Sequence, residues 1–244
     1  MPAHKEKLFE AKNQSGDKYT IWKSPEQKTF FFRAAMAVDA DGSPKAYHPE
    51  NKGLDDLEHA GEPGNWWAIE THNGKPNGKP VIQGDDDPAP GYYISMTALY
   101  DPDINRPNPR RYVDATKIPY IVLPENNDRE FLKKADVEEG DFAAVYNAKN
   151  GKLSFAIFAD TGLFFAGNVE EYRFGEGSIA LAEALDIPSN PRNGGTTKKD
   201  LLYIVFPGSG NRKPRSITDI NNKAKKLFEE WGGIKHAKDL FDEV

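Results

Sequence analysis

The sequence predicts a mainly β protein, a β-rich α+β fold whose strands close into a barrel. About eight segments have strand character, two have helical periodicity, and the two kinds do not alternate as βαβ units. The chain has 244 residues, of which 38% are hydrophobic, enough for a sizeable core. No linker divides it, so we expect one domain over residues 1–244, with a loose polar segment at 1–16.

The expected strands are runs of aromatic and aliphatic residues that end at turn residues. They cover residues 19–22, 29–38, 66–70, 92–99, 118–124, 141–146, 153–160 and 201–206. The turn Asn-Ala-Lys-Asn-Gly-Lys at 147–152 predicts that the strands on either side of it form a hairpin.

Two segments carry helix signals. Ser178 is placed to cap a short helix over 178–185. A longer helix over 216–231 begins at Ser216, repeats apolar residues on one face, and ends at the glycines 232 and 233. We expect these helices to lie at the periphery of the barrel.

The composition excludes several classes of protein and site. The absence of cysteine excludes disulfides, thiol catalysis and Cys-ligated metals. The net charge of −6 disfavours nucleic acid, and no run reaches the roughly 20 apolar residues that a membrane span needs. The five histidines lack metal-site spacing, and we interpret the Asp-Ala-Asp-Gly segment at 39–42 as a turn and not as the start of a calcium loop. We expect no metal, no cofactor, no membrane and no nucleic-acid partner, and a monomer.

Two carboxylates stand out as candidate catalytic residues. Asp160 follows the apolar run 153–159, at the rim of an expected strand, and Glu176 lies between two glycines. Two carboxylates at one barrel mouth are what glycoside hydrolysis requires: one protonates the leaving oxygen and the other activates water or attacks the sugar. From spacing alone an alternative stays open, in which Asp160 caps a turn and Glu176 is a solvated loop residue.

Several motifs resemble glycoside hydrolase family 75, the chitosanases first known from fungi. These are Ala-Val-Asp-Ala-Asp-Gly at 37–42, Tyr-Val-Asp-Ala-Thr-Lys-Ile-Pro-Tyr-Ile-Val-Leu-Pro at 112–124, Gly-Asp-Phe-Ala-Ala-Val at 140–145, Phe-Ala-Asp-Thr-Gly at 158–162, Gly-Glu-Gly-Ser at 175–178 and Tyr-Ile-Val-Phe-Pro at 203–207. The resemblance covers roughly residues 30–207, in the family's order. The sequence departs from the fungal pattern in a longer segment between the two carboxylates and in lacking cysteines.

The resemblance implies endo-hydrolysis of β-1,4-linked glucosamine polymers with inversion and without a cofactor, and extracellular action. It assigns the catalytic roles to Asp160 and Glu176; we expect Glu176 to be the general acid and Asp160 the general base. The N-terminus has no apolar signal segment, so we expect a mature form or a signal-independent route of export. The Asp-Thr-Gly strand end is also similar to an element of double-psi barrels, which predicts a six-stranded double-psi-like β-barrel with peripheral helices.

A polysaccharide substrate calls for flat apolar surfaces and, for glucosamine, for carboxylates that pair with ammonium groups. The candidate substrate-binding residues are Asp41, Asp114, Trp67, Tyr93 and Thr161. The competing interpretation is core packing for the aromatic residues and turn formation for the aspartates.

Two other functions stay open at this stage. One is a muramidase or lytic transglycosylase that cleaves peptidoglycan as an exported effector, although the net negative charge disfavours an anionic wall as substrate. The other is a non-catalytic carbohydrate-binding module, which needs no pair of carboxylates at one cleft.

Overall fold

The computed structural model describes residues 5–12, 18–125, 129–163, 165–166, 169–170 and 174–244. Among these residues, six strands close into a barrel, in the order β3 (Thr29–Asp39), β11 (Glu176–Ser178), β6 (Tyr120–Glu125), β8 (Leu153–Leu163), β7 (Phe142–Asn147) and β12 (Thr196–Phe206). β12 pairs with β3 again and completes the ring. The pairs β3–β11 and β6–β8 are parallel and the other pairs of the ring are antiparallel. This closed barrel confirms the predicted fold class.

Two further strands extend the sheet beyond β3. β1 (Glu6–Lys12) pairs with β2 (Lys18–Ser24), which pairs with β3. The expectation of a loose segment at 1–16 is therefore wrong for residues 6–12, while residues 1–4 and 13–16 lie outside the described part. The strand forms because Phe9 and Ala11, two positions apart, are both buried on one face.

The two predicted helices are present, and their caps are the predicted serines. Ser178 Oγ accepts a hydrogen bond from the amide of Leu181 at the start of α2 (Ile179–Ala184). Ser216 Oγ accepts one from the amide of Asp219 in α3 (Ile217–Trp231). α1 (Glu130–Ala135) and α4 (Gly233–Phe241) were not predicted. Gly232 ends α3 with a φ of 127°, and α4 begins directly after it.

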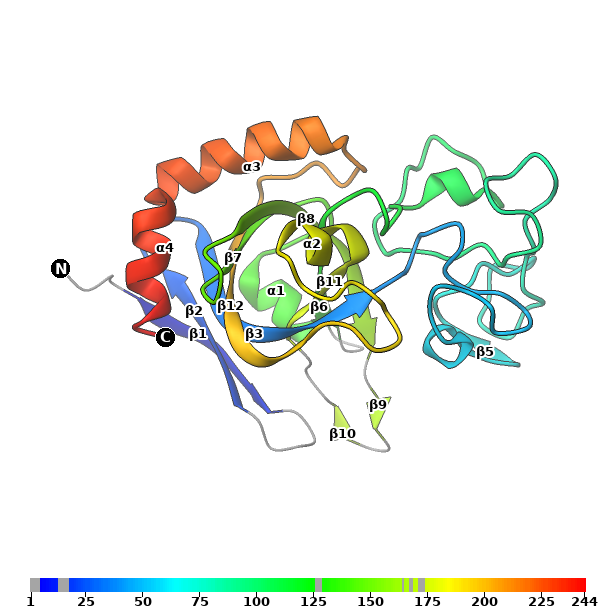
Figure 1. Cartoon of the computed structure of the whole chain (residues 1–244), viewed down its shortest axis with the longest axis horizontal. Helices are drawn as coiled ribbons and strands as arrows, with labels where there is room; N and C mark the ends of the chain where they lie inside the picture. The colour runs from blue at the N-terminus through cyan, green and yellow to red at the C-terminus, as the bar shows by residue number, and fades with distance from the viewer. Residues whose placement is uncertain (1–4, 13–17, 126–128, 164, 167–168, 171–173) are drawn as a thin grey trace.

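The barrel wall separates two apolar layers. Its interior includes Phe32, stacked on Tyr203 at a centroid distance of 4.9 Å, and Phe158. On its outside, α3 packs over β7 and β8 through a buried face that includes Phe228. Figure 1 shows α3 along one side of the barrel, with α4 turning across its end.

Residues 40–118 form an irregular region beside the barrel (Figure 1). The prediction of strands at 66–70 and 92–99 is wrong, because these segments make only isolated bridges such as Ile69 to Ser95 and the short strand β5 (Asn65–Trp66). β5 pairs with β4 (Gly61–Glu62). The region also has two 3-10 turns, η1 (Leu57–Ala60) and η2 (Pro109–Arg111). Backbone hydrogen bonds such as that from the Glu70 amide to the Ile94 carbonyl still join the two predicted segments, and the buried Glu70 carboxylate adds side-chain contacts. Glu70 accepts hydrogen bonds from the Tyr112 hydroxyl and the Arg106 guanidinium. A further short pair, β9 (Phe165–Ala166) with β10 (Val169–Glu170), follows β8.

Replacing Phe228 by alanine tests the packing of α3. The side chain is fully buried against Phe155 and Trp231, so Phe228→Ala should lower the free energy of unfolding by about 3–5 kcal/mol in urea titrations. The control is Lys226→Ala on the same helix, whose side chain is 77% exposed and which should change stability by less than about 0.5 kcal/mol. A loss below about 1 kcal/mol for Phe228→Ala would contradict this packing.

Candidate active site

Strand register places Glu176 and Asp160 in one row across the barrel wall. Glu176 on β11 lies opposite Val122 on β6, and Val122 lies opposite Asp160 on β8. Residues opposite each other in a sheet point to the same face. Two strand spacings of about 4.8 Å put the two Cα atoms roughly 10 Å apart. The structure thus brings the two predicted catalytic residues to one face of the barrel.

The glycines beside Glu176 serve strand packing. Gly175 has a φ of +98°, and a Cβ there would meet the Ala35 carbonyl oxygen at 2.2 Å. A Cβ at Gly177 would meet the Leu181 side chain at 2.7 Å. The absence of side chains at Gly175 and Gly177 therefore lets the backbone of β11 lie close to β3 and α2. Glu176 itself is half-buried.

The side chain of Asp160 is held by backbone amides. β8 has an irregularity just before it, where the pairing with β6 passes from Phe158 to Asp160. Its Oδ1 accepts hydrogen bonds from the amides of Ala98 at 2.9 Å and Thr161 at 2.8 Å. Asp160 is 7% exposed, because the irregular region reaches back over the end of β8 at Ala98.

Two more aspartates meet Asp160. One carboxylate oxygen from each of Asp39, Asp41 and Asp160 lies within 4.8 Å of the others. Asp39, at the end of β3, accepts hydrogen bonds from the Tyr120 hydroxyl at 2.9 Å and from the Asp41 amide at 2.8 Å. Ser95 donates to Asp41 at 3.1 Å. Asp39 was not among the predicted site residues, although its place at the end of a strand in the 37–42 motif was the available signal.

Burial raises the pKa values of all three aspartates, and the charges of neighbouring carboxylates add to this effect. Burial raises the pKa of Asp39 to about 6. Burial, and then the charge of Asp39, raise the pKa of Asp160 well above its ordinary value, with a further contribution from Glu176. Burial followed by the charges of Asp39 and Asp160 does the same to the pKa of Asp41. The cluster therefore retains protons at mildly acidic pH, and its members titrate together.

The same cluster is the group of described residues whose carboxylates lie close enough to hold a metal ion. Hard divalent cations prefer carboxylate oxygens, but only in the deprotonated form. The raised pKa values of the three aspartates therefore weigh against tight binding of such an ion at mildly acidic pH.

The other predicted binding residues lie in different surroundings. Thr161 adjoins Asp160 through its amide, and Asp41 is in the cluster. Asp114 accepts hydrogen bonds from the Thr116 amide and hydroxyl, as a turn residue does.

Tyr93 is half-buried beside Trp66. Trp67 is 49% exposed, and its indole N–H donates to the His59 carbonyl.

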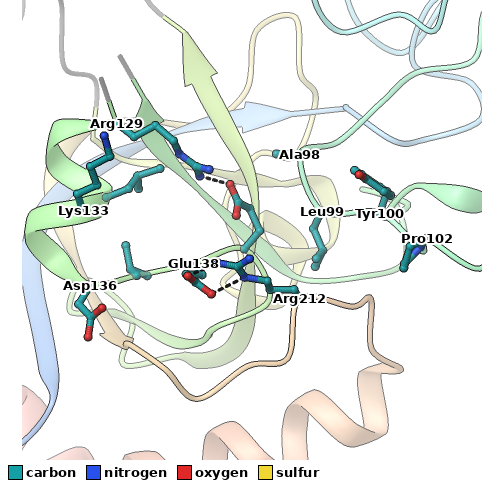
Figure 2. Close-up of a pocket in the computed structure, with 12 residues that line it drawn as sticks. Ala98, Leu99, Tyr100, Pro102, Arg129, Lys133, Asp136, Glu138 and Arg212 are labelled. Carbon is teal, nitrogen blue, oxygen red and sulfur yellow. Dashed lines mark hydrogen bonds and ion pairs between the residues drawn. The ribbon is translucent and has the colours of Figure 1, made fainter. Parts of the chain in front are cut away.

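A cavity of about 530 Å³ adjoins Asp160 without containing it. Ala98, whose amide binds Asp160, lies on its wall (Figure 2). The charged side chains of the wall are balanced, in contrast to the expected excess of carboxylates: Asp136, Glu138 and Glu139 against Arg129, Lys133 and Arg212. The acidic surroundings lie at the aspartate cluster instead.

Comparison with known protein families gives one match. A family described as fungal chitosanase of glycosyl hydrolase group 75 matches residues 36–236, a range that includes Asp39, Asp41, Asp160 and Glu176. No curated protein matches the chain. Within the described residues, no helix has the length and apolar character that crossing a membrane requires.

The pH dependence of stability tests the aspartate cluster. Because the pKa of Asp39 in the folded state, about 6, exceeds its ordinary value of 3.8, its contribution is favourable at low pH and is lost as the pH rises from about 4 through 6. Asp39→Asn should therefore reduce the fall in unfolding free energy between pH 4 and pH 7, measured by urea titration. Asp239→Asn, at an exposed position on α4, is the control for losing one carboxylate. An equal fall in Asp39→Asn and wild type would contradict a raised pKa of Asp39 in the folded protein.

Proposed function

The chain belongs to glycosyl hydrolase group 75, the family of fungal chitosanases, and we propose that it cleaves internal bonds of β-1,4-linked glucosamine chains with inversion. Membership makes it a glycosidase of the chitosanase type. The linkage, the stereochemistry and the catalytic residues belong to the proposal. A non-catalytic carbohydrate-binding module is set aside by the same membership.

The observation that carries the proposal is the row Glu176–Val122–Asp160. Inverting glycosidases place their two carboxyl groups roughly 6.5–9.5 Å apart, because a water molecule must fit between the base and the sugar. Retaining enzymes need about 5–5.5 Å. Two strand spacings put the Cα atoms of Glu176 and Asp160 roughly 10 Å apart, which leaves room for such a water between side chains that point to the same face.

The surroundings of the two carboxylates favour Asp160 as the general acid, the reverse of the role expected from the sequence. A general acid must hold a proton near the working pH, and burial beside Asp39 raises the pKa of Asp160. Its Oδ1 already accepts two amide hydrogen bonds, so Oδ2 is the atom that carries the proton to the glycosidic oxygen.

Glu176 then acts as the general base. Its half-buried position leaves part of the side chain in contact with solvent, from which the attacking water comes. Glu176 precedes α2, and the N-terminal end of a helix favours a nearby anion. That preference opposes the role of acid and agrees with the role of base. Glu176 takes a proton from the attacking water, and Asp160 gives its proton to the oxygen of the departing sugar.

Charge favours a cationic polymer over peptidoglycan. Asp39, Asp41, Asp160 and Glu176 surround the expected cleavage position, and the net charge is −6. Protonated glucosamine units are attracted to this region, whereas the carboxyl groups of a bacterial wall are repelled. Chitosan is an extracellular polymer, so we place the action of the enzyme outside the cell.

Removing either carboxylate should abolish most activity without unfolding the protein. Asp160→Asn and Glu176→Gln keep the shape of each side chain and remove the proton or charge, so each should lower kcat on chitosan by about 10²–10⁴-fold, measured as reducing ends released. Glu62→Gln, an exposed position on β4, is the control. Near-wild-type turnover in either variant removes that residue from the mechanism.

Chemical rescue separates the acid from the base. Glu176→Ala should regain turnover with azide, because a small anion can enter the vacated place and attack the anomeric carbon. Asp160→Asn should regain turnover on glucosamine oligomers that carry a good leaving group, since that group needs no proton. The swapped pattern would restore Glu176 as acid and Asp160 as base. Nuclear magnetic resonance of the first product should show the α-anomer, and a β-anomer would exclude inversion.

A further inference from the structure

We propose that the cavity beside Ala98 binds the stretch of glucosamine chain that continues past Asp160. This inference rests on the proposed function and adds where the substrate lies. The volume of about 530 Å³ falls within the 300–1,000 Å³ that ligand sites occupy. Ala98 joins it to the cluster, because Ala98 lines the cavity and its amide binds Asp160.

The position of the cavity follows from the order of the strands. Glu176 lies on the β6 side of Asp160, because the sheet runs β11-β6-β8-β7. The wall formed by residues 136–139 leads into β7, on the opposite side of β8, where the Gly140 amide donates to the Phe158 carbonyl. Another part of the wall comes from the start of α1 (Arg129, Leu132 and Lys133), which packs on β6. The cavity therefore spans the end of β8, where the Leu99 amide donates to the Ala159 carbonyl. A chain whose bond is cleaved at Asp160 enters the cavity past Ala98, the residue whose amide binds Asp160.

The cavity wall combines an aromatic side chain with an apolar lining, as a sugar site does. Tyr100 is 42% exposed, and the Arg111 guanidinium lies 4.0 Å from its ring centroid, which holds the ring in place. Leu99, Leu132 and Val137 supply apolar surface. Sugar rings present C–H faces to such surfaces and hydroxyl groups at their edges. Figure 2 shows Tyr100 and Leu99 on one wall and the charged residues on the other.

Two carboxylates on the other wall suit ammonium groups. Glu138 pairs with Arg212 (Figure 2). Glu139 pairs with Arg129. The Arg212 guanidinium lowers the pKa of Glu138, so this carboxylate stays charged at the mildly acidic pH at which glucosamine units are protonated. The arginines fix the carboxylates in position, and the remaining acceptor positions can bind an ammonium group.

Substitution of Tyr100 tests the aromatic part of the site. Tyr100→Ala should raise KM on long chitosan about three- to tenfold by removing the stacking surface, with kcat changed less than about twofold because Tyr100 does not reach the reacting bond. Tyr100→Phe keeps the ring and should stay within about twofold of wild type in both. Equal KM values for the alanine and phenylalanine variants would overturn the proposal.

Glu138→Gln tests the charged wall of the proposed sugar site. The Glu138 side chain is 53% exposed, so the substitution does not put folding at risk. KM on fully deacetylated chitosan should rise about two- to fivefold at low salt, and the difference should shrink at high salt. Glu230→Gln on α3 removes an equally exposed carboxylate away from the cavity and is the matched control. A lower KM in Glu138→Gln would indicate an anionic ligand and overturn the proposal, as would equal KM values in the two variants. A wild type that releases no reducing ends would instead remove the proposed function, and this inference with it.

Discussion

The register of β6 between β11 and β8 is the constraint on which the rest of the site depends. Val122 has Glu176 as its neighbour on one side and Asp160 on the other. Backbone hydrogen bonds therefore set the separation of the Cα atoms from which the two carboxylate side chains extend. Barrel closure through β3 and β12 holds this register, and Gly175 and Gly177 let β11 lie close enough to β3 and α2 to keep its place.

The second determinant is the burial of like charges at the edge of that frame. The end of β3 brings Asp39 and Asp41 to Asp160, and the irregular region covers all three through Ala98 and Ser95. Ionising all three together is unfavourable, so the cluster keeps protons that an exposed carboxyl would lose. Burying like-charged carboxylates together lowers the stability of the folded protein. Such an arrangement is typical of functional sites, where an acid must stay protonated for its task.

Local signals in the sequence predicted those parts of the fold that local interactions determine. The hairpin of β7 and β8, the serine caps of α2 and α3, and the carboxylates at 160 and 176 follow from turn chemistry, periodicity and motif. Residues 66–70 and 92–99 look like strands, yet their neighbourhood is organised by tertiary contacts of the buried Glu70. α1 is only six residues long and has no side-chain cap, so it gave no signal. The role of Asp160 depends on Ala98 and Asp39, which lie 62 and 121 positions away in the sequence, and no pattern around residue 160 reveals them.

The proposed mechanism requires that Asp160 is protonated in the resting enzyme. Labelling the protein with ¹³C at the aspartate carboxyl carbons, and assigning the Asp160 signal by its loss in Asp160→Asn, allows its titration to be followed by nuclear magnetic resonance. Burial and the neighbouring charges raise its pKa, so the Asp160 signal should titrate clearly above the ordinary aspartate value of about 3.9. The midpoint should move down in Asp39→Asn, which removes the largest neighbouring charge. A midpoint at or below about 3.9 that Asp39→Asn leaves unchanged would contradict the account.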